Sequence, residues 1–149
     1  MLNENAILLV EDNDDDAELT RRAFQKARIS NRFIRIEDGA DALAYLFCTG
    51  AHADRDPLDL PAVVLLDLKL PRLGGLEVLQ AIRENERTRH LPVVILTSSN
   101  EDQDRIRAYE HFANSYIQKP VDYDQFVEAA RQLGLYWMVL NKSPPRKAE

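Results

Sequence analysis

The sequence has a single cysteine, no long apolar run and fewer basic than acidic residues, and each of these features excludes a class of protein. Cys48 cannot form an intramolecular disulfide, and it continues an apolar helical pattern with Leu43, Leu46 and Phe47, so we interpret it as a packing residue. No apolar stretch approaches the roughly 20 residues of a membrane helix, and the amino terminus lacks the pattern of a secretion signal. We therefore expect a soluble, cytoplasmic protein.

The charge balance argues against nucleic acid as a partner. The chain has 25 acidic and 19 basic residues and a formal net charge of -6. Nucleic-acid affinity depends largely on Lys and Arg releasing counterions from phosphates, so direct binding to DNA is not expected. The three histidines, at positions 52, 90 and 111, are scattered and have no neighbours at metal-ligand spacing. They are interpreted as ordinary surface or hydrogen-bonded residues.

The length of 149 residues suits one compact domain and leaves no room for a second, separate output domain. We assign this domain to residues 1–140. Residues 141–149 contain two adjacent prolines and mixed charges, and they are expected to form a flexible carboxy-terminal tail.

Short apolar runs alternate with helix-length segments along the chain. They predict buried parallel strands at Ala6–Val10, Val63–Leu66, Val93–Leu96 and Ser115–Ile117. Phe33, Ile34 and Ile36 indicate a further strand, the second along the chain. In an open parallel α/β sheet, the groups just beyond the carboxyl ends of the strands meet in one crevice. We therefore expect the chemistry of this protein at that edge of the sheet.

Two features interrupt the helical segments. The helix that starts near Ala40 is expected to stop at Gly50. The segment Ala51–Pro61 holds two prolines and several charges without periodicity, and it is predicted to be a surface loop with no catalytic role.

Five polar clusters lie within or just after the strand-like runs: Glu11-Asp12, Asp67, Thr97, Tyr116 and Lys119-Pro120. A pair of carboxylates after the first strand and another after the third provide the oxygen ligands that Mg²⁺ prefers. Such acids repel one another unless a cation lies among them, so the cluster predicts a dependence on Mg²⁺. Asp14, Asp15 and Asp16 are additional candidate ligands, but the solvated first turn of a helix explains them better.

Asp67 is the candidate nucleophile of this site. Its carboxylate would attack an activated phosphoryl donor and become an acyl phosphate. The ammonium of Lys119 and the hydroxyl of Thr97 suit contacts to phosphoryl oxygens. The Lys119–Pro120 bond is a candidate for the cis isomer, because proline makes that isomer less costly.

With these residues the chain resembles a response-regulator receiver domain over nearly its whole length. Thr97 follows Asp67 by 30 residues and Lys119 follows it by 52, and both separations match the family. The resemblance implies a doubly wound, flavodoxin-like (βα)5 fold of class α/β, with a central five-stranded parallel sheet of strand order 2-1-3-4-5. The resemblance implies that Asp67 is the phospho-acceptor and that Mg²⁺ is held by the side chains of Glu11, Asp12 and Asp67 and by the backbone carbonyl of Lys69. It implies that Thr97 and Lys119 contact the phosphoryl group. Thr97 and Tyr116 are the switch residues that it implies.

Within this family, the chain is similar to the stand-alone regulators partnered with bacterial and cyanobacterial phytochromes. The segments Ile7–Asn13 and Leu65–Pro71, the long loop Ala51–Pro61 and the late Trp137 carry this finer resemblance. It implies a sensor histidine kinase as partner, with a bacteriophytochrome as the candidate, and output through protein contacts. Ser98, where the family often has alanine, and the length of the loop are departures that remove no group the chemistry needs.

The carboxy-terminal part of the chain has apolar residues on more than one helical face, which one core-facing stripe cannot bury. A continuous apolar surface usually marks a partner site, so we predict a homodimer. The proposed dimer or partner surface consists of Phe112, Tyr136, Trp137, Met138 and Leu140. Packing within the chain against the long loop is the alternative.

Three other functions are open to a chain of this architecture. A Mg²⁺-dependent phosphohydrolase commonly has a second acid two residues after its nucleophile, and that position is Lys69 here. A flavin-binding domain needs phosphate-cradling donors after the first strand, where the acidic segment Glu11–Asp16 would repel phosphate. A phosphorylation-independent adaptor would have lost some of the key residues, and all of them are present.

Overall fold

The computed structural model describes residues 5–97, 110, 113, 115–118 and 123–133. Its strands are β1 (Ile7–Val10), β2 (Phe33–Ile36), β3 (Val63–Asp67), β4 (Val93–Thr97) and β5 (Ser115–Gln118). Its helices are α1 (Asp14–Lys26), α2 (Gly39–Phe47), the short 3-10 helix η1 (Gly50–His52), α3 (Gly75–Glu84) and α5 (Tyr123–Leu133). Within these residues, no helix combines the length and apolarity that crossing a membrane requires.

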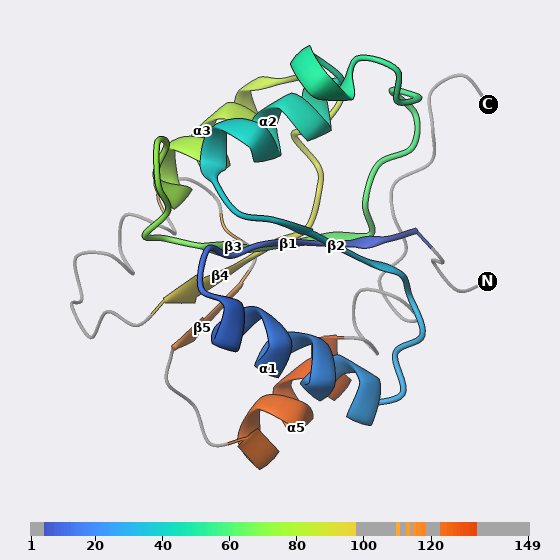
Figure 1. Ribbon diagram of the computed structural model, residues 1–149, viewed down its shortest axis with the longest axis vertical. Helices are drawn as coiled ribbons and strands as arrows, with labels where there is room; N and C mark the ends of the chain where they lie inside the picture. The colour runs from blue at the N-terminus through green and yellow to red at the C-terminus, as the bar shows by residue number, and fades with distance from the viewer. Residues whose placement is uncertain (1–4, 98–109, 111–112, 114, 119–122, 134–149) are drawn as a thin grey trace.

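The strands form one parallel sheet in the order β2-β1-β3-β4-β5, which confirms the predicted fold class. Helices α2 and α3 cover one face, and α1 and α5 cover the other (Figure 1). The central strands β1 and β3 are buried at every position. This burial explains why their sequences are continuous apolar runs rather than alternating patterns.

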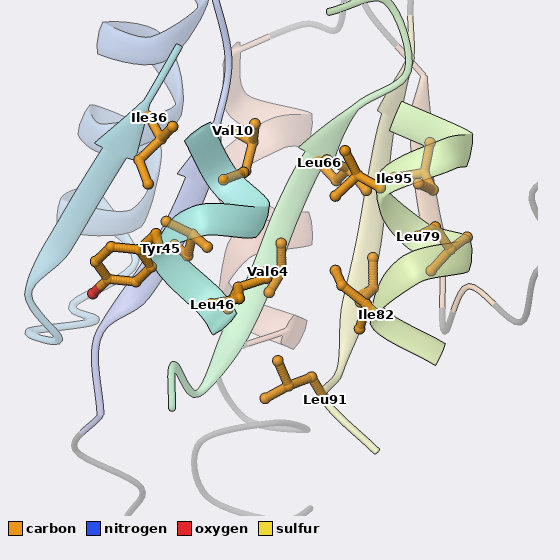
Figure 2. Close-up of a cluster of buried hydrophobic side chains, with 14 of the residues drawn as sticks. Val10, Ile36, Tyr45, Leu46, Val64, Leu66, Leu79, Ile82, Leu91 and Ile95 are labelled. Carbon is orange, nitrogen blue, oxygen red and sulfur yellow. The ribbon is translucent and has the colours of Figure 1, made fainter. Parts of the chain in front are cut away.

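The sheet divides the apolar core into two layers. Leu8 and Val10 of β1 belong to the layer under α2 and α3, whereas Ile7 and Leu9 belong to the layer with α1 and α5. Successive side chains of a strand point to opposite faces, so one short strand contributes to both layers. Figure 2 shows the first layer, in which strand side chains such as Val64 lie against the α2 and α3 side chains.

Helix α1 starts directly beyond β1. Asn13 is its N-cap, because the side-chain oxygen accepts a hydrogen bond of 2.9 Å from the amide of Asp16. Asp14, Asp15 and Asp16 form the acidic first turn, where their negative charges interact favourably with the positive end of the helix dipole. This placement supports their interpretation as a helix start.

Helix α2 starts at a similar cap. Asp38 accepts a 2.7 Å hydrogen bond from the amide of Asp41 and another of 2.9 Å from Arg72 Nη2. The amide of Asp41 is the largest cause, and Arg72 a further one, of a pKa of Asp38 below its usual value. The ionised carboxylate is therefore the form that stabilises the folded chain.

Replacing Asp38 by alanine is expected to lower the free energy of unfolding by about 1 kcal/mol at pH 7, because the cap is lost. Asp38→Asn keeps a cap oxygen and should lose less. Because the folded pKa is depressed, the ionic part of this stability is present above the unfolded pKa of about 3.9 and is lost as the pH falls through the folded pKa. Urea unfolding at pH 7 and at acidic pH checks this, and an alanine variant as stable as wild type at pH 7 would contradict it.

The carboxyl end of α2 corrects the prediction that Gly50 stops this helix. The helix ends at Phe47, and Cys48 takes the left-handed conformation with φ of 58° while the amide of Thr49 bonds to the carbonyl of Ala44 at 3.0 Å. This arrangement is a Schellman-type end formed without glycine at the left-handed position. Cys48 is partly buried as a free thiol and is a cap rather than a residue inside the helix.

The loop between α2 and β3 lies on the surface, as predicted, but arginines anchor its backbone. The Arg55 guanidinium lies 3.6 Å from the centre of the Tyr45 ring and donates a 2.7 Å hydrogen bond to the carbonyl of Asp59. Arg87 donates to the carbonyls of Pro57 and Leu46, both at 2.7 Å. The loop is therefore fixed to the end of α2.

Candidate functional site

The register of the sheet brings the predicted acids together. Val10 of β1 pairs with Leu66 of β3, so the next residues along the two parallel strands, Glu11 and Asp67, lie side by side. Asp12 follows Glu11 in the turn that leads to α1. Strand pairing alone thus positions the acidic pair beside the candidate nucleophile at the carboxyl edge of the sheet.

Glu11, Asp12 and Asp67 each offer a carboxylate oxygen, and these three oxygens all lie within 4.8 Å of one another. Glu11 is fully buried, Asp67 is 7% exposed, and Asp12 is exposed to solvent. Three negative groups at this separation are unfavourable without a nearby positive charge. Their hard oxygen donors fit Mg²⁺, which is usually held by one or two carboxylates together with waters or phosphate oxygens.

Backbone contacts around the start of α3 hold Asp67 in place. The amide of Lys69 donates to Asp67 Oδ1 at 3.2 Å, and the amide of Gly75 donates to the carbonyl of Leu68 at 2.9 Å. A Cβ atom on Gly75 would lie 2.2 Å from the carbonyl oxygen of Asp67. Only glycine permits this approach, so the helix start packs directly against the candidate nucleophile.

The loop from Lys69 to α3 is tied to the start of α2. Arg72, within this loop, has a left-handed backbone with φ of 64°, and its side chain bonds to Asp38 at 2.9 Å. A Cβ atom on Gly39, the first residue of α2, would lie 2.0 Å from the carbonyl oxygen of Leu73. These contacts fix the loop that contains Lys69, the predicted source of a metal-binding carbonyl.

The turn between β1 and α1 contains an arginine contact that the sequence analysis missed. Arg35 of β2 donates to the backbone carbonyl of Glu11 at 3.1 Å and to Asp14 Oδ1 at 2.8 Å. One basic residue in a four-residue strand gives no motif. The only available signal was its place near the carboxyl end of a strand predicted to lie in the same sheet.

The remaining site residues are placed only in part. Asp67 pairs with Leu96, so Thr97, the last residue of β4, lies one position further along the adjacent strand. Tyr116 lies in β5 and pairs with Ile95. Thr97 is therefore at the carboxyl end of its strand, whereas Tyr116 is the second residue of β5 and lies level with the middle of β4. The predictions for Lys119, Pro120 and the proposed dimer surface (Phe112, Tyr136, Trp137, Met138 and Leu140) lie outside the described residues.

Several known proteins are similar to this chain in both sequence and fold. A probable methanogenesis regulatory protein, FilR2 of Methanothrix harundinacea, is 42% identical over 138 residues, which cover 93% of this chain and 86% of the relative. The response regulator Rcp1 of Synechocystis is 33% identical over 132 residues, covering 89% and 88% of the two chains. A solved structure of Rcp1 in its Mn²⁺-bound form matches with a TM-score of 0.82 and covers 95% of this chain and 99% of that chain.

A third similar protein is the bacteriophytochrome response regulator RtBRR. Its solved structure is 49% identical and has a TM-score of 0.78, covering 97% of this chain and 86% of that chain. The family model described as response regulator receiver domain matches residues 7–131, which include β1 through most of α5. Together with the parallel sheet of order β2-β1-β3-β4-β5, this match shows that the chain belongs to the response regulator receiver domain family.

Proposed function

We propose that the chain accepts a phosphoryl group on Asp67 from a phosphohistidine of a sensor histidine kinase, in a reaction that requires Mg²⁺. The observation that carries this proposal is the cluster of Glu11, Asp12 and Asp67, whose carboxylate oxygens lie within 4.8 Å of one another at the carboxyl edge of the sheet. Phosphorylation on an aspartate is general for the family. Asp67 is the acid at the end of β3, and it is nearly buried beside the pair.

In this reaction an Asp67 carboxylate oxygen attacks the phosphorus atom. A P–O bond forms, the P–N bond to the imidazole breaks, and the electron pair of that bond stays on the imidazole nitrogen, which is then protonated. The Lys69 amide, which donates to Asp67 Oδ1 at 3.2 Å, helps to orient the carboxylate. The proposed contacts to the phosphoryl oxygens are the Thr97 hydroxyl and the Lys119 ammonium.

Glu11, Asp12, Asp67 and the carbonyl of Lys69 are the proposed ligands of Mg²⁺. The chemistry supplied by the bound cation is neutralisation of these acids and of the incoming phosphoryl oxygens. Without such neutralisation, the negative charge of Glu11 and Asp12 opposes the approach of a phosphoryl anion.

The output of the proposed modification is a change in protein contacts rather than catalytic turnover. Lys69 occupies the position two residues after Asp67, where an aspartyl-phosphate hydrolase commonly has an acid. The net charge of -6 disfavours nucleic acid as a direct partner. Thr97 and Tyr116 are the proposed switch residues, and a second copy of the chain is a proposed partner through Phe112 and the carboxy-terminal apolar residues.

A bacteriophytochrome is the proposed type of kinase. The similarity to RtBRR, a bacteriophytochrome response regulator, supports this proposal. The similarity to FilR2, a probable methanogenesis regulatory protein, does not point to a phytochrome. Phosphotransfer from purified candidate kinases, compared at short times, identifies the partner. A bacteriophytochrome kinase that transfers no faster than unrelated kinases would contradict this part.

Incubation with acetyl phosphate tests the chemistry without a kinase. The protein should gain the mass of one phosphoryl group in the presence of Mg²⁺ and lose this reactivity after treatment with a chelator. Steady release of product from a small phosphate ester would favour the hydrolase alternative. An adduct that forms equally well with chelator would contradict the role of the metal.

A further inference from the structure

Arg35 connects the two ends of the turn that contains the acidic pair. From β2, its Nε donates to the carbonyl of Glu11 at 3.1 Å, and its Nη1 donates to Asp14 Oδ1 at 2.8 Å. Its Nη2 lies 3.6 Å from Glu37 Oε1, on the segment just beyond the same strand. One guanidinium therefore joins the end of β1, the start of α1 and the end of β2.

The residues between the two ends of this turn include two of the three clustered acids. Glu11 and Asp12 lie in the segment from Glu11 to Asp14. Arg35 binds this segment at both ends, through the backbone carbonyl of Glu11 and the carboxylate of Asp14. Further bonds fix the turn from within, because the Asn13 amide donates to Glu11 Oε2 at 3.3 Å. The position of the acids thus depends on the shape that these contacts give the turn.

The contacts of Arg35 suit positioning better than fold stability. The Arg35 and Asp14 side chains are 30% and 85% exposed, and an exposed ion pair of this kind contributes little to stability. The bond to the Glu11 carbonyl, however, holds the backbone of a predicted metal ligand. The planar guanidinium can make both bonds at once, which the single ammonium of lysine does not reproduce.

We propose that Arg35 is a positioning residue that holds the turn from Glu11 to Asp14 in the shape that binds a divalent cation. The proposal rests on the Mg²⁺ site of the proposed function. The residues that support metal ligands typically change metal affinity by 10- to 100-fold when they are removed. Arg35 acts through the backbone of Glu11 and the side chain of Asp14 and does not itself contact the cation.

The positive charge of Arg35 has the opposite effect on Mg²⁺ affinity from its positioning of the turn. A positive charge near the acids disfavours a cation, so loss of that charge alone would tighten Mg²⁺ binding. Lysine retains the charge and loses the paired geometry, while methionine loses both. The two substitutions therefore separate positioning from electrostatics.

The experiment is calorimetric titration of the full chain with Mg²⁺ alone, without a phosphoryl donor. Arg35→Lys is expected to weaken Mg²⁺ binding by about tenfold, and Arg35→Met is expected to weaken it by a smaller factor, because loss of the positive charge offsets part of the lost positioning. Arg22→Met is the matched control, because it removes one positive charge from an exposed side chain that pairs with Glu18 on α1. Its affinity should equal that of wild type, and urea unfolding without Mg²⁺ should give similar midpoints for all four proteins.

Unchanged binding by Arg35→Lys together with tighter binding by Arg35→Met would overturn the proposal in favour of a pure charge effect. If both variants bound Mg²⁺ with wild-type affinity, Arg35 would have no positioning role and would form only a surface ion pair. These results leave the proposed function intact if the wild type binds Mg²⁺ and is phosphorylated. A wild type that binds no Mg²⁺ would contradict both the inference and the metal requirement of the proposed function.

Discussion

Asp67→Asn is expected to reduce phosphoryl uptake from acetyl phosphate to the detection limit. The amide is a poor nucleophile, yet its oxygen can still accept the hydrogen bond that the Lys69 amide donates to Asp67 Oδ1 at 3.2 Å. The variant should therefore keep the fold while losing the reactive group. Intact-protein mass after incubation with Mg²⁺ measures the loss directly.

Asp15→Asn is the matched control for this experiment. Asp15 belongs to the exposed first turn of α1 and is outside the cluster of three carboxylates. It should take up one phosphoryl group like the wild type. Uptake by Asp67→Asn at the wild-type level would eliminate Asp67 as the acceptor, whereas loss of uptake by Asp15→Asn would show that any acid near the site has the same effect.

The adjacent glycines at the start of α3 provide the second large effect. A Cβ atom on Gly75 would lie 2.2 Å from the Asp67 carbonyl oxygen and 2.7 Å from the Leu68 Cα, so the backbone must shift. Gly75→Ala is expected to lower the free energy of unfolding by about 1–3 kcal/mol, as overpacking does elsewhere. It should also slow phosphorylation, because the shift moves the backbone of Asp67.

Gly74→Ala is the control one residue earlier. Its nearest contact would be Glu77 Oε1 at 3.4 Å, which is the end of a flexible side chain, and its φ of -68° suits any residue. As an N-cap change from glycine to alanine, it should cost less than about 1 kcal/mol. Urea unfolding and the rate of acetyl phosphate labelling measure both variants. Equal losses in the two variants would contradict a specific approach of Gly75 to Asp67.

The strands and the acidic cluster were predictable from the sequence for one physical reason. Strands buried on both faces must be continuous apolar runs, and parallel pairing then aligns whatever follows them, so Glu11 and Asp67 meet once Val10 pairs with Leu66. The resemblance to receiver domains added the strand order, which apolar pattern alone does not specify.

The parts that sequence reasoning missed depend on single residues without a repeating pattern. Cys48 ends α2 in a left-handed conformation that is uncommon for residues other than glycine, so Gly50 was the natural but wrong choice. Arg35 meets Glu11 and Asp14 across more than 20 positions of the chain, and only the folded sheet brings them together. Such contacts have no signature in local sequence spacing.

Borohydride reduction of the labelled protein tests whether Asp67 itself carries the phosphoryl group. Sodium borohydride converts a phosphorylated aspartate to homoserine, so peptide mapping after Mg²⁺-dependent labelling shows which residue was modified. We expect homoserine at position 67 after labelling with Mg²⁺ and none when Mg²⁺ is removed. Homoserine at another aspartate, or none at position 67 in a protein that has gained the phosphoryl mass, would contradict this expectation.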